Sequence, residues 1–490
     1  MCGVMGVIGS QSASRDVYAG LLALQHRGQD AAGILSFNSP EQRFHLVRGA
    51  GLVSQTFNRS AMNSLSGDAA IGHTRYSTVG RTEDRDIQPS IVPQPFGIGM
   101  AHNGNLSNYK ALADKIRASQ NRYLQTGNDL EVLQCLLAEG LSSSTARENA
   151  PGCFFFDDLR RAVELVFDVA RGGYAVVGII AGKGMYAFRD PNGIRPLVLG
   201  RRDGDGSHAV ASETSALNIT GHRPVRHIEP GEIIFIENNG ALHSARTKVT
   251  RHAPCMFEWV YFASAESQIE GRGVYGARLE LGRALAKIIS QRQAAGARSS
   301  GDSACESLEI DMVVPVPDTS RTAAIALAET LKIPYRDVLI KNRYVFRSFI
   351  LNTQEERERA LKIKLAPVAS EIEGKNVLLV DDSIVRGTTA RRLVGLVREA
   401  GARKVYMAST CPPVRHPCFY GIDFPDARGL VAHGREESEV ADEIGVDGLF
   451  YLDMRGLREA IGLPALCTAC LDGDYPVPVA QAPEGFCGEG

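Results

Sequence analysis

The chain has 490 residues, of which 44% are hydrophobic and 22% charged, and its formal net charge is −2. This length accommodates two to four domains with their own cores, and the near-neutral charge argues against nucleic acid as the main partner. No stretch reaches about 18 uninterrupted apolar residues, so the sequence predicts no membrane partner. Ten cysteines without a secretory signal favour a reducing cytoplasm over a disulfide framework.

Cys2 follows the initiator methionine, so removal of Met1 would leave a thiol and a free α-amino group on one residue. An α-amino group has an unperturbed pKa of about 8, so near neutral pH it can take the thiol's proton. The resulting thiolate can attack a carbonyl carbon. Residues 1–9 are apolar and glycine-rich and predict a buried strand. We therefore take Cys2 as a candidate nucleophile inside the fold.

Four polar motifs follow Cys2. They read Leu-Gln-His-Arg-Gly-Gln-Asp at 24–30, Gly-His-Thr-Arg-Tyr-Ser-Thr at 72–78, His-Asn-Gly-Asn at 102–105 and Asn-Asp-Leu-Glu at 128–131. Arg75 offers a fork of donors for an α-carboxylate, and Asp129 offers an acceptor for an α-ammonium. The side chain of Asn103 and the N–H of Gly104, in a predicted Asn-Gly turn, can converge on an oxyanion.

In this order, the motifs resemble the glutaminase domain of the class II, or N-terminal-nucleophile, amidotransferases. The resemblance implies that Cys2 is the nucleophile and that Arg75 and Asp129 bind glutamine. It assigns Asn103 and Gly104 to the oxyanion hole.

The first half of the chain is rich in glycine and short β-like runs, such as residues 173–180 and 231–236. These runs suit stacked antiparallel sheets, and residues 187–197 predict a hairpin with an Asn-Gly turn. With the resemblance, they lead us to expect a four-layer αββα glutaminase domain over residues 2–240.

From about residue 250 the pattern changes. Apolar runs at 312–316 and 377–380 alternate with helical stretches, as a parallel α/β sheet requires. Four apolar residues at i, i+3, i+4 and i+7 predict one helix face that packs on this sheet. They are Ala390, Leu393, Val394 and Val397. We expect an α/β domain over residues 255–490, including a cysteine-rich tail.

Residues 377–389 read Val-Leu-Leu-Val-Asp-Asp-Ser-Ile-Val-Arg-Gly-Thr-Thr. A buried strand ends in Asp381 and Asp382, and a loop of small residues then opens a helix. Such a loop presents N–H groups and hydroxyls to a phosphate. The two carboxylates can hold ribose hydroxyls directly or through a hydrated divalent metal. The motif resembles the phosphoribosyl pyrophosphate (PRPP) motif of the type I phosphoribosyltransferases.

Two further segments resemble parts of the same family: residues 314–321 its pyrophosphate loop, and residues 341–344 the start of its mobile catalytic loop. The resemblance implies Mg²⁺ at Thr319, Asp381 and Asp382, and Lys341 and Arg343 over the pyrophosphate. The residues that it implies for the 5′-phosphate are Ser383, Arg386, Gly387, Thr388 and Thr389. Phe346 stands where we expect glycine, which implies a different closure of the mobile loop.

A glutaminase followed by a phosphoribosyltransferase resembles the amidophosphoribosyltransferase family over nearly the whole chain. The resemblance implies an enzyme that releases ammonia from glutamine at Cys2 and transfers it to C1 of PRPP. The products would be 5-phosphoribosylamine, pyrophosphate and glutamate, in the first step of purine biosynthesis. The resemblance also implies purine nucleotides as feedback inhibitors, and we expect a homo-oligomer, either a dimer or a tetramer.

Two alternatives stay open at this point. A different class II amidotransferase would share the first half, but the motif at 377–389 argues against it. A PRPP-sensing regulatory or inactive homologue would keep the nucleotide pocket, but it would not need an intact Cys2 site.

Cys467 and Cys470 have the C-x-x-C spacing of metal ligands. Four thiolates suit a [4Fe-4S] cluster and tetrahedral zinc equally well on chemistry alone. With Cys255 and Cys418, the pair matches the four ligand positions in the iron–sulfur branch of the family. The resemblance therefore favours [4Fe-4S] in a structural or oxygen-sensing role, with zinc as the alternative.

Overall fold

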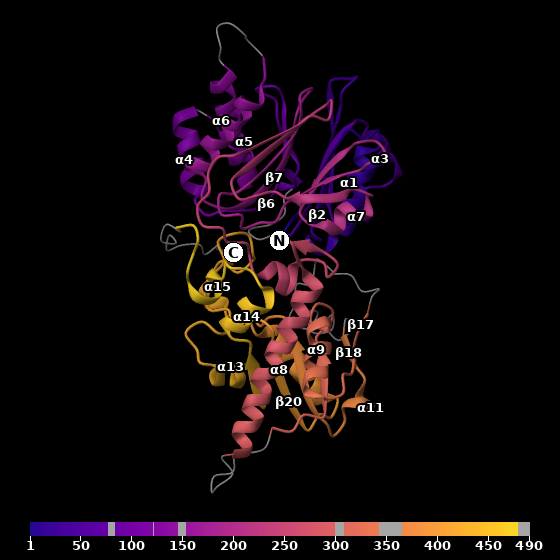
Figure 1. Cartoon of the computed structure of the whole chain (residues 1–490), viewed down its shortest axis with the longest axis vertical. Coiled ribbons are helices and arrows are strands. Elements are labelled where there is room, and N and C mark those ends of the chain that lie inside the picture. Colours follow the sequence, from indigo (N-terminus) through magenta and orange to yellow (C-terminus); the bar gives the residue numbers. More distant parts are fainter. Residues whose placement is uncertain (77–83, 121, 146–152, 299–307, 343–364, 479–490) are drawn as a thin grey trace.

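The structure is a computed structural model of the whole chain, and it describes residues 1–76, 84–120, 122–145, 153–298, 308–342 and 365–478. Figure 1 shows two units stacked along the long axis, the first coloured indigo to magenta and the second orange to yellow. The N-terminus lies at their junction. Among the described residues, no helix combines the length and apolar character needed to cross a membrane.

Two antiparallel sheets form the first unit. One has seven strands in the order β11-β9-β10-β1-β4-β2-β3, and the other has six in the order β13-β12-β8-β7-β6-β5. Their bounds are β1 Gly3–Ile8, β2 Ala31–Asn38, β3 Arg43–Ala50, β4 Ala69–Arg75, β5 Ser90–Val92, β6 Ile98–Leu106, β7 Gly172–Ile180, β8 Gly184–Arg189, β9 Val198–Arg201, β10 His208–Ala211, β11 Arg223–His227, β12 Glu232–Glu237 and β13 Leu242–Arg246. Apolar side chains of both sheets, including Val4 and Ala101, form one core between them.

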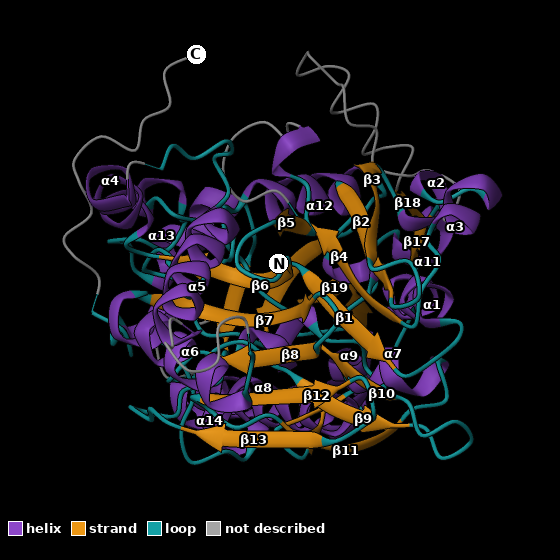
Figure 2. Ribbon diagram, turned by 90° about the horizontal axis from the view of Figure 1, so that it is seen from above, coloured by secondary structure: helices purple, strands orange, loops and turns teal. Residues whose placement is uncertain are grey.

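Helices cover the outer face of each sheet, on opposite sides of the unit in Figure 2. The first sheet carries α1 (Ala13–Ala23), α2 (Val53–Thr56), α3 (Arg59–Ser64) and α7 (Thr214–Ile219). The second sheet carries α4 (Tyr109–Gln120), α5 (Asp129–Thr145) and α6 (Phe156–Val169). The predicted αββα arrangement is therefore confirmed.

A parallel sheet of four strands, in the order β16-β19-β20-β21, forms the second unit. The strands are β16 Met312–Pro315, β19 Asn376–Asp381, β20 Lys404–Ser409 and β21 Gly448–Tyr451, and the main helices are α8 Val274–Arg298, α9 Arg321–Leu331, α12 Thr388–Glu399 and α13 Glu437–Ile444. Leu378 and Val380 of β19 face the core that holds α8 and α9, whereas Val377 and Leu379 face the core that holds α12 and α13. Both faces of the sheet are therefore covered, as predicted for a parallel α/β sheet.

The predicted apolar face of α12 is confirmed, because all four of its residues are at most 3% exposed. The second unit also contains shorter elements. They include the π-helical turn η3 (Glu258–Phe262), the strand pairs β14 (Gln268–Ile269) with β15 (Arg272–Gly273) and β17 (Leu339–Lys341) with β18 (Leu365–Pro367), and the helices α11 (Ala369–Ile372), α14 (Met454–Ile461) and α15 (Ala469–Asp472).

Two predictions from Asn-Gly dipeptides were wrong in detail. Asn103 and Gly104 lie inside strand β6, where pairing with β7 overrides the local turn preference. The turn before Gly193 does form, and buried Asp190 accepts the N–H groups of Asn192 and Ile194. However, β8 and β9 belong to different sheets, so residues 187–197 carry the chain between sheets and do not form a hairpin.

A buried histidine in the first unit has a stability consequence. His222 lies between α7 and β11, is 1% exposed, and contacts the hydroxyls of Ser207 and Thr220 at 3.1 and 2.9 Å. Burial, aided by the nearby Arg202 guanidinium, lowers the pKa of His222 to about 4. As the pH falls, His222 in the unfolded chain therefore binds a proton near pH 6.5, whereas His222 in the folded chain binds it only near pH 4.

We expect His222→Gln to reduce the loss of stability between pH 6.5 and 4. The stabilising contribution of neutral His222 is complete above pH 6.5 and disappears as the pH falls toward 4, because only the unfolded state gains the proton. Thermal midpoints measured across this range test the expectation. Equal slopes for His222→Gln and the wild-type protein would contradict this expectation.

Candidate functional site

Cys2 lies just before β1, at the junction of the two units. Its N–H is 3.3 Å from Oδ1 of Asn103, and its Sγ is 3.9 Å from the carbonyl oxygen of Tyr76. Met1 is 2% exposed, and burial lowers the pKa of its amino group to about 5. Burial at this end of the chain therefore disfavours the charged form of the Met1 amine.

The side chain of Asn103 presents a donor next to this candidate nucleophile. Asn103 is 1% exposed, and its Nδ2 has no hydrogen-bond partner among the described residues. A buried, unpartnered donor is suited to an oxyanion that forms during reaction. Gly104 has φ +144°, and a Cβ there would lie 2.0 Å from the carbonyl oxygen of Gly173. Only glycine lets β6 approach β7 this closely.

Arg75 and Asp129 lie on either side of the 3₁₀ turn η2 (Asp84–Asp86). Arg75 ends β4 and donates through Nη1 to the carbonyl of Asp86, which also accepts from the amide of Asn128. Asp129 begins α5, and its Oδ2 accepts the N–H of Leu106 at 2.9 Å. Burial opposes ionisation of Asp129, but His102 and the backbone donors outweigh it and lower its pKa. Asp129 is therefore a carboxylate, ready to accept from an ammonium group.

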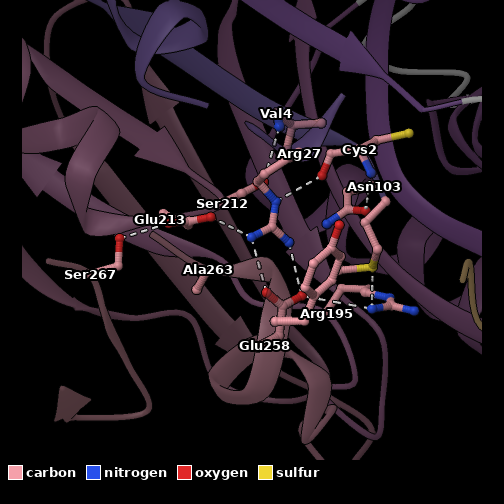
Figure 3. A network of polar contacts seen from close by, with 12 residues as sticks. Cys2, Val4, Arg27, Asn103, Arg195, Ser212, Glu213, Glu258, Ala263 and Ser267 are labelled. Atoms are coloured by element: carbon pink, nitrogen blue, oxygen red, sulfur yellow. Dashed lines mark hydrogen bonds and ion pairs between the residues drawn. The ribbon is translucent and has the colours of Figure 1, made fainter. Parts of the chain in front are cut away.

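A buried ion-pair network links Cys2 to the second unit (Figure 3). Arg27 is fully buried and donates through Nε to the carbonyl of Cys2 at 3.0 Å. Its guanidinium lies 2.5 Å from Glu213 and 2.8 Å from Glu258, and Arg195 lies 3.7 Å from Glu258. Sequence reasoning included Arg27 in a motif but assigned it no role. It missed the network because Glu213 and Glu258 are 186 and 231 residues away.

The PRPP motif forms a compact acidic site at the carboxyl end of β19. Ser383 Oγ donates to Asp382 Oδ1 at 2.8 Å. Burial raises the pKa of both aspartates, that of Asp382 to about 6, and repulsion between the two carboxylates raises that of Asp381 further. Two buried carboxylates that resist ionisation together are suited to a divalent cation, which would replace the retained proton. Gly387, at φ +71°, turns the chain into α12.

The other described residues that were predicted for the PRPP site lie in segments around the same edge of the sheet. Thr319 lies in the turn between β16 and α9, next to this edge because β16 pairs in parallel with β19. Lys341 ends β17 and forms an ion pair with Asp318. Arg386 is exposed and donates to the carbonyl of Asp423. Thr388 and Thr389 are exposed in the first turn of α12. Arg343 and Phe346 lie outside the described residues.

The structure brings together the four predicted cysteine ligands. Cys255, Cys418, Cys467 and Cys470 line a cavity of about 10 Å³ together with Arg195. Burial raises the pKa of Cys255 to about 11 and also raises the pKa values of Cys467 and Cys470, and each is raised further by neighbouring cysteines. These three are therefore neutral thiols unless a cation compensates their charge.

No set of three or more His, Cys, Asp or Glu side chains in the described ranges is arranged as a ready-made metal site. The four thiols nevertheless provide the donor set of tetrahedral zinc or [4Fe-4S]. A cavity of about 10 Å³ has room for one water-sized atom, so a four-iron cluster needs more space than this cavity offers.

Comparison with protein families identifies the class of each unit. The family described as "Glutamine amidotransferase domain" matches residues 73–219, and that described as "Phosphoribosyl transferase domain" matches residues 286–420. Curated relatives named amidophosphoribosyltransferase extend over nearly the full length. The Pseudomonas aeruginosa relative is 41% identical over 97% of this chain and 93% of its own. The Escherichia coli relative is 42% identical over 94% of this chain and 88% of its own. This chain belongs to the amidophosphoribosyltransferase family.

Solved structures agree with this assignment. The Bacillus subtilis glutamine PRPP amidotransferase, complexed with ADP and GMP, superposes with a TM-score of 0.83 at 36% identity, covering 98% of each chain. A structure described as the allosteric regulatory enzyme of purine biosynthesis gives a TM-score of 0.84 at 37% identity, covering 98% of this chain and 97% of that one. The chain is therefore a transferase, and the predicted combination of two domains is confirmed.

We expect Gly104→Ala to disrupt the candidate oxyanion hole. The added Cβ meets the Gly173 carbonyl at 2.0 Å, so β6 must separate from β7 beside Cys2. Glutaminase activity should fall at least tenfold and the thermal midpoint should drop. Gly395→Ala is the control, because nothing lies within 4 Å of its Cβ, and within α12 it should stabilise the chain by about 0.5–1 kcal/mol. Wild-type glutaminase activity in Gly104→Ala would refute this account.

Proposed function

We propose that this chain releases ammonia from glutamine in its first unit and transfers it to C1 of PRPP in its second. The products are 5-phosphoribosylamine, pyrophosphate and glutamate, in the first step of purine biosynthesis. The observation that carries the proposal is the position of Cys2 at the junction of the units, next to Nδ2 of Asn103, which has no hydrogen-bond partner in the described part of the chain. The family membership supports both half-reactions.

In the glutaminase half-reaction, removal of Met1 frees the α-amine of Cys2, which takes the thiol's proton. The thiolate attacks the side-chain carbonyl of glutamine, and Asn103 Nδ2 and Gly104 N–H donate to the oxyanion. Ammonia leaves with the proton held by the α-amine, and water then hydrolyses the thioester to glutamate. Arg75 binds the α-carboxylate of glutamine, and Asp129 binds its α-ammonium.

In the transferase half-reaction, ammonia forms a bond to C1 of PRPP as the bond from C1 to pyrophosphate breaks. Thr319, Asp381 and Asp382 would hold Mg²⁺, which supplies positive charge to the pyrophosphate. Lys341 and Arg343 add cationic groups there. The loop and helix start that bind the 5′-phosphate comprise Ser383, Arg386, Gly387, Thr388 and Thr389.

The proposal extends to organisation and regulation. We assign the glutaminase to residues 2–240 and the phosphoribosyltransferase to residues 255–490, and the two matched family ranges fall inside these limits. Purine nucleotides act as feedback inhibitors, supported by the ADP and GMP complex of the B. subtilis relative. The active form is a cytoplasmic homo-oligomer, a dimer or a tetramer.

We expect Cys2→Ala to abolish synthesis from glutamine but to retain synthesis from high concentrations of ammonia. Free ammonia reaches C1 of PRPP without the thioester step, so only the first half-reaction is lost. Pyrophosphate release with each nitrogen source measures the two routes. Asp381→Asn combined with Asp382→Asn is the matched comparison and should remove both routes. Equal loss of both routes in a correctly folded Cys2→Ala protein would argue against this division of labour.

We further propose that Cys255, Cys418, Cys467 and Cys470 hold a [4Fe-4S] cluster. Their convergence on one cavity supports a shared ligand, and the match to the iron–sulfur branch favours the cluster over zinc. The cluster would join the C-terminal tail to the connection between the units. Neither half-reaction requires electron transfer, so its role is structural or oxygen-sensing.

We expect protein purified without oxygen to be brown, to absorb broadly near 400 nm and to contain about four irons per chain. Cys470→Ser should lose the colour and most of the iron, whereas Cys135→Ser, at a buried cysteine outside this cavity, should retain both. Stoichiometric zinc without visible absorbance would identify the tetrahedral zinc site instead.

A further inference from the structure

His102 is buried beside the candidate oxyanion hole but faces away from Cys2. Successive side chains of a strand point to opposite faces. Asn103 contacts Cys2, and Ala101, on the same face, lies in the core between the sheets. Met100 lies in the core under α5, so His102 projects to that side as well. His102 therefore cannot be the base for the Cys2 thiol, although it is next to Asn103 in sequence.

The amide of Gln88 fixes the tautomer of His102. The backbone N–H of His102 donates to Oε1 of Gln88 at 2.8 Å, which identifies the amide oxygen. The Nε2 of Gln88 therefore faces Nδ1 of His102, 3.0 Å away, and donates to it. Because Nδ1 accepts this bond, the neutral imidazole carries its proton on Nε2. Both residues are at most 4% exposed, so water does not compete for these contacts.

Nε2 of His102 lies beside the carboxylate that we assign to glutamine recognition. It is 3.3 Å from Oδ1 of Asp129, close enough for an electrostatic contact, although it has no aligned hydrogen-bond acceptor among the described residues. Oδ2 of Asp129 accepts the N–H of Leu106 at 2.9 Å. Asp129 is also the first residue of α5, where the helix dipole favours a negative charge. Among the described residues each of these oxygens has one such contact, and the remaining lone pairs can accept from a substrate.

We propose that Gln88 is a positioning residue that confers selectivity for an α-ammonium group, by holding His102 so that its Nε2–H, and not a lone pair, lies beside the Asp129 carboxylate. This inference rests on the proposed function, in which Asp129 binds the α-ammonium of glutamine. It adds a determinant of substrate selectivity that contacts neither the substrate nor Cys2. Without Gln88, the imidazole can adopt the other tautomer, whose Nε2 lone pair repels the carboxylate.

The test compares glutamine with its des-amino analogue, glutaric acid monoamide. Both offer the same amide and the same carboxylate, but only glutamine carries the α-ammonium. In Gln88→Met, which keeps the side-chain length without the amide, we expect the preference for glutamine in kcat/KM to fall about tenfold. The loss should appear in the KM for glutamine, with kcat changed less than threefold and hydrolysis of the analogue unchanged.

Gln134→Met is the matched control. Gln134 is another buried glutamine that lines the same cavity of about 470 Å³ as Gln88, but it bonds to Ser90 and Ile98. It should keep the wild-type preference. Gln88→Asn is a second variant, because the shorter amide cannot reach His102 and disturbs packing differently. The preference is a ratio within one sample, so partial unfolding of either variant does not change it.

A double-mutant cycle with Asp129→Asn tests whether Gln88 acts on substrate selectivity through Asp129. If Gln88 acts through Asp129, Gln88→Met should cause no further loss of preference in the Asp129→Asn background. An equal decline for both substrates, or an effect that persists without the Asp129 carboxylate, would overturn the inference. Synthesis from ammonia should stay at the wild-type rate in Gln88→Met. A wild-type protein that releases no ammonia from glutamine would refute the proposed function itself.

Discussion

The candidate chemistry at Cys2 depends on the buried contact of Arg27 with Glu213 and Glu258. Taking a guanidinium out of water costs several kcal/mol, and only partners with good geometry recover that energy. Arg27 has both carboxylates within 3 Å, and Arg195 brings a second positive charge near Glu258. The two positive charges therefore balance two negative ones. Removing either carboxylate would leave a buried positive charge without compensation. The fold is therefore most stable when Arg27 contacts both Glu213 and Glu258.

This network has a direct consequence for the position of Cys2. The Nε of Arg27 is bonded to the carbonyl of Cys2, while its Nη atoms are bonded to Glu213 of the first unit and Glu258 in the connection to the second. The backbone of Cys2, the proposed nucleophile, is therefore held by the same charged side chain that joins the units. On the other side, Asn103 fixes the N–H of Cys2, so the residue is positioned from both ends. A terminal residue that would otherwise fray becomes part of a rigid site.

Sequence was sufficient where local patterns determine structure. The apolar run ending in Asp381 and Asp382 predicted strand β19, its helix and the acidic site, because a buried parallel strand, a loop of small residues and a helix follow one another directly. The Asn-Gly pair at 103 and 104 gave a wrong prediction, because pairing of β6 with β7 overrides the local preference of this pair for a turn. The Arg27 network could not be predicted, because nothing in the local sequence around a charged residue indicates a partner that lies about two hundred residues away.

The cysteine cavity and the Cys2 site share one cationic side chain. Arg195 lines the cavity formed by the four thiols, donates to the carbonyl of Tyr420, and lies 3.7 Å from Glu258. Burial alone would lower the pKa of Arg195, but Cys255, Cys418 and Glu258 reverse this and raise it. A divalent ion held by four thiolates would leave this site with a net negative charge, which would attract Arg195. Glu258 lies near Arg195 and also contacts Arg27, so one buried carboxylate lies between the cysteine cavity and the network that holds Cys2.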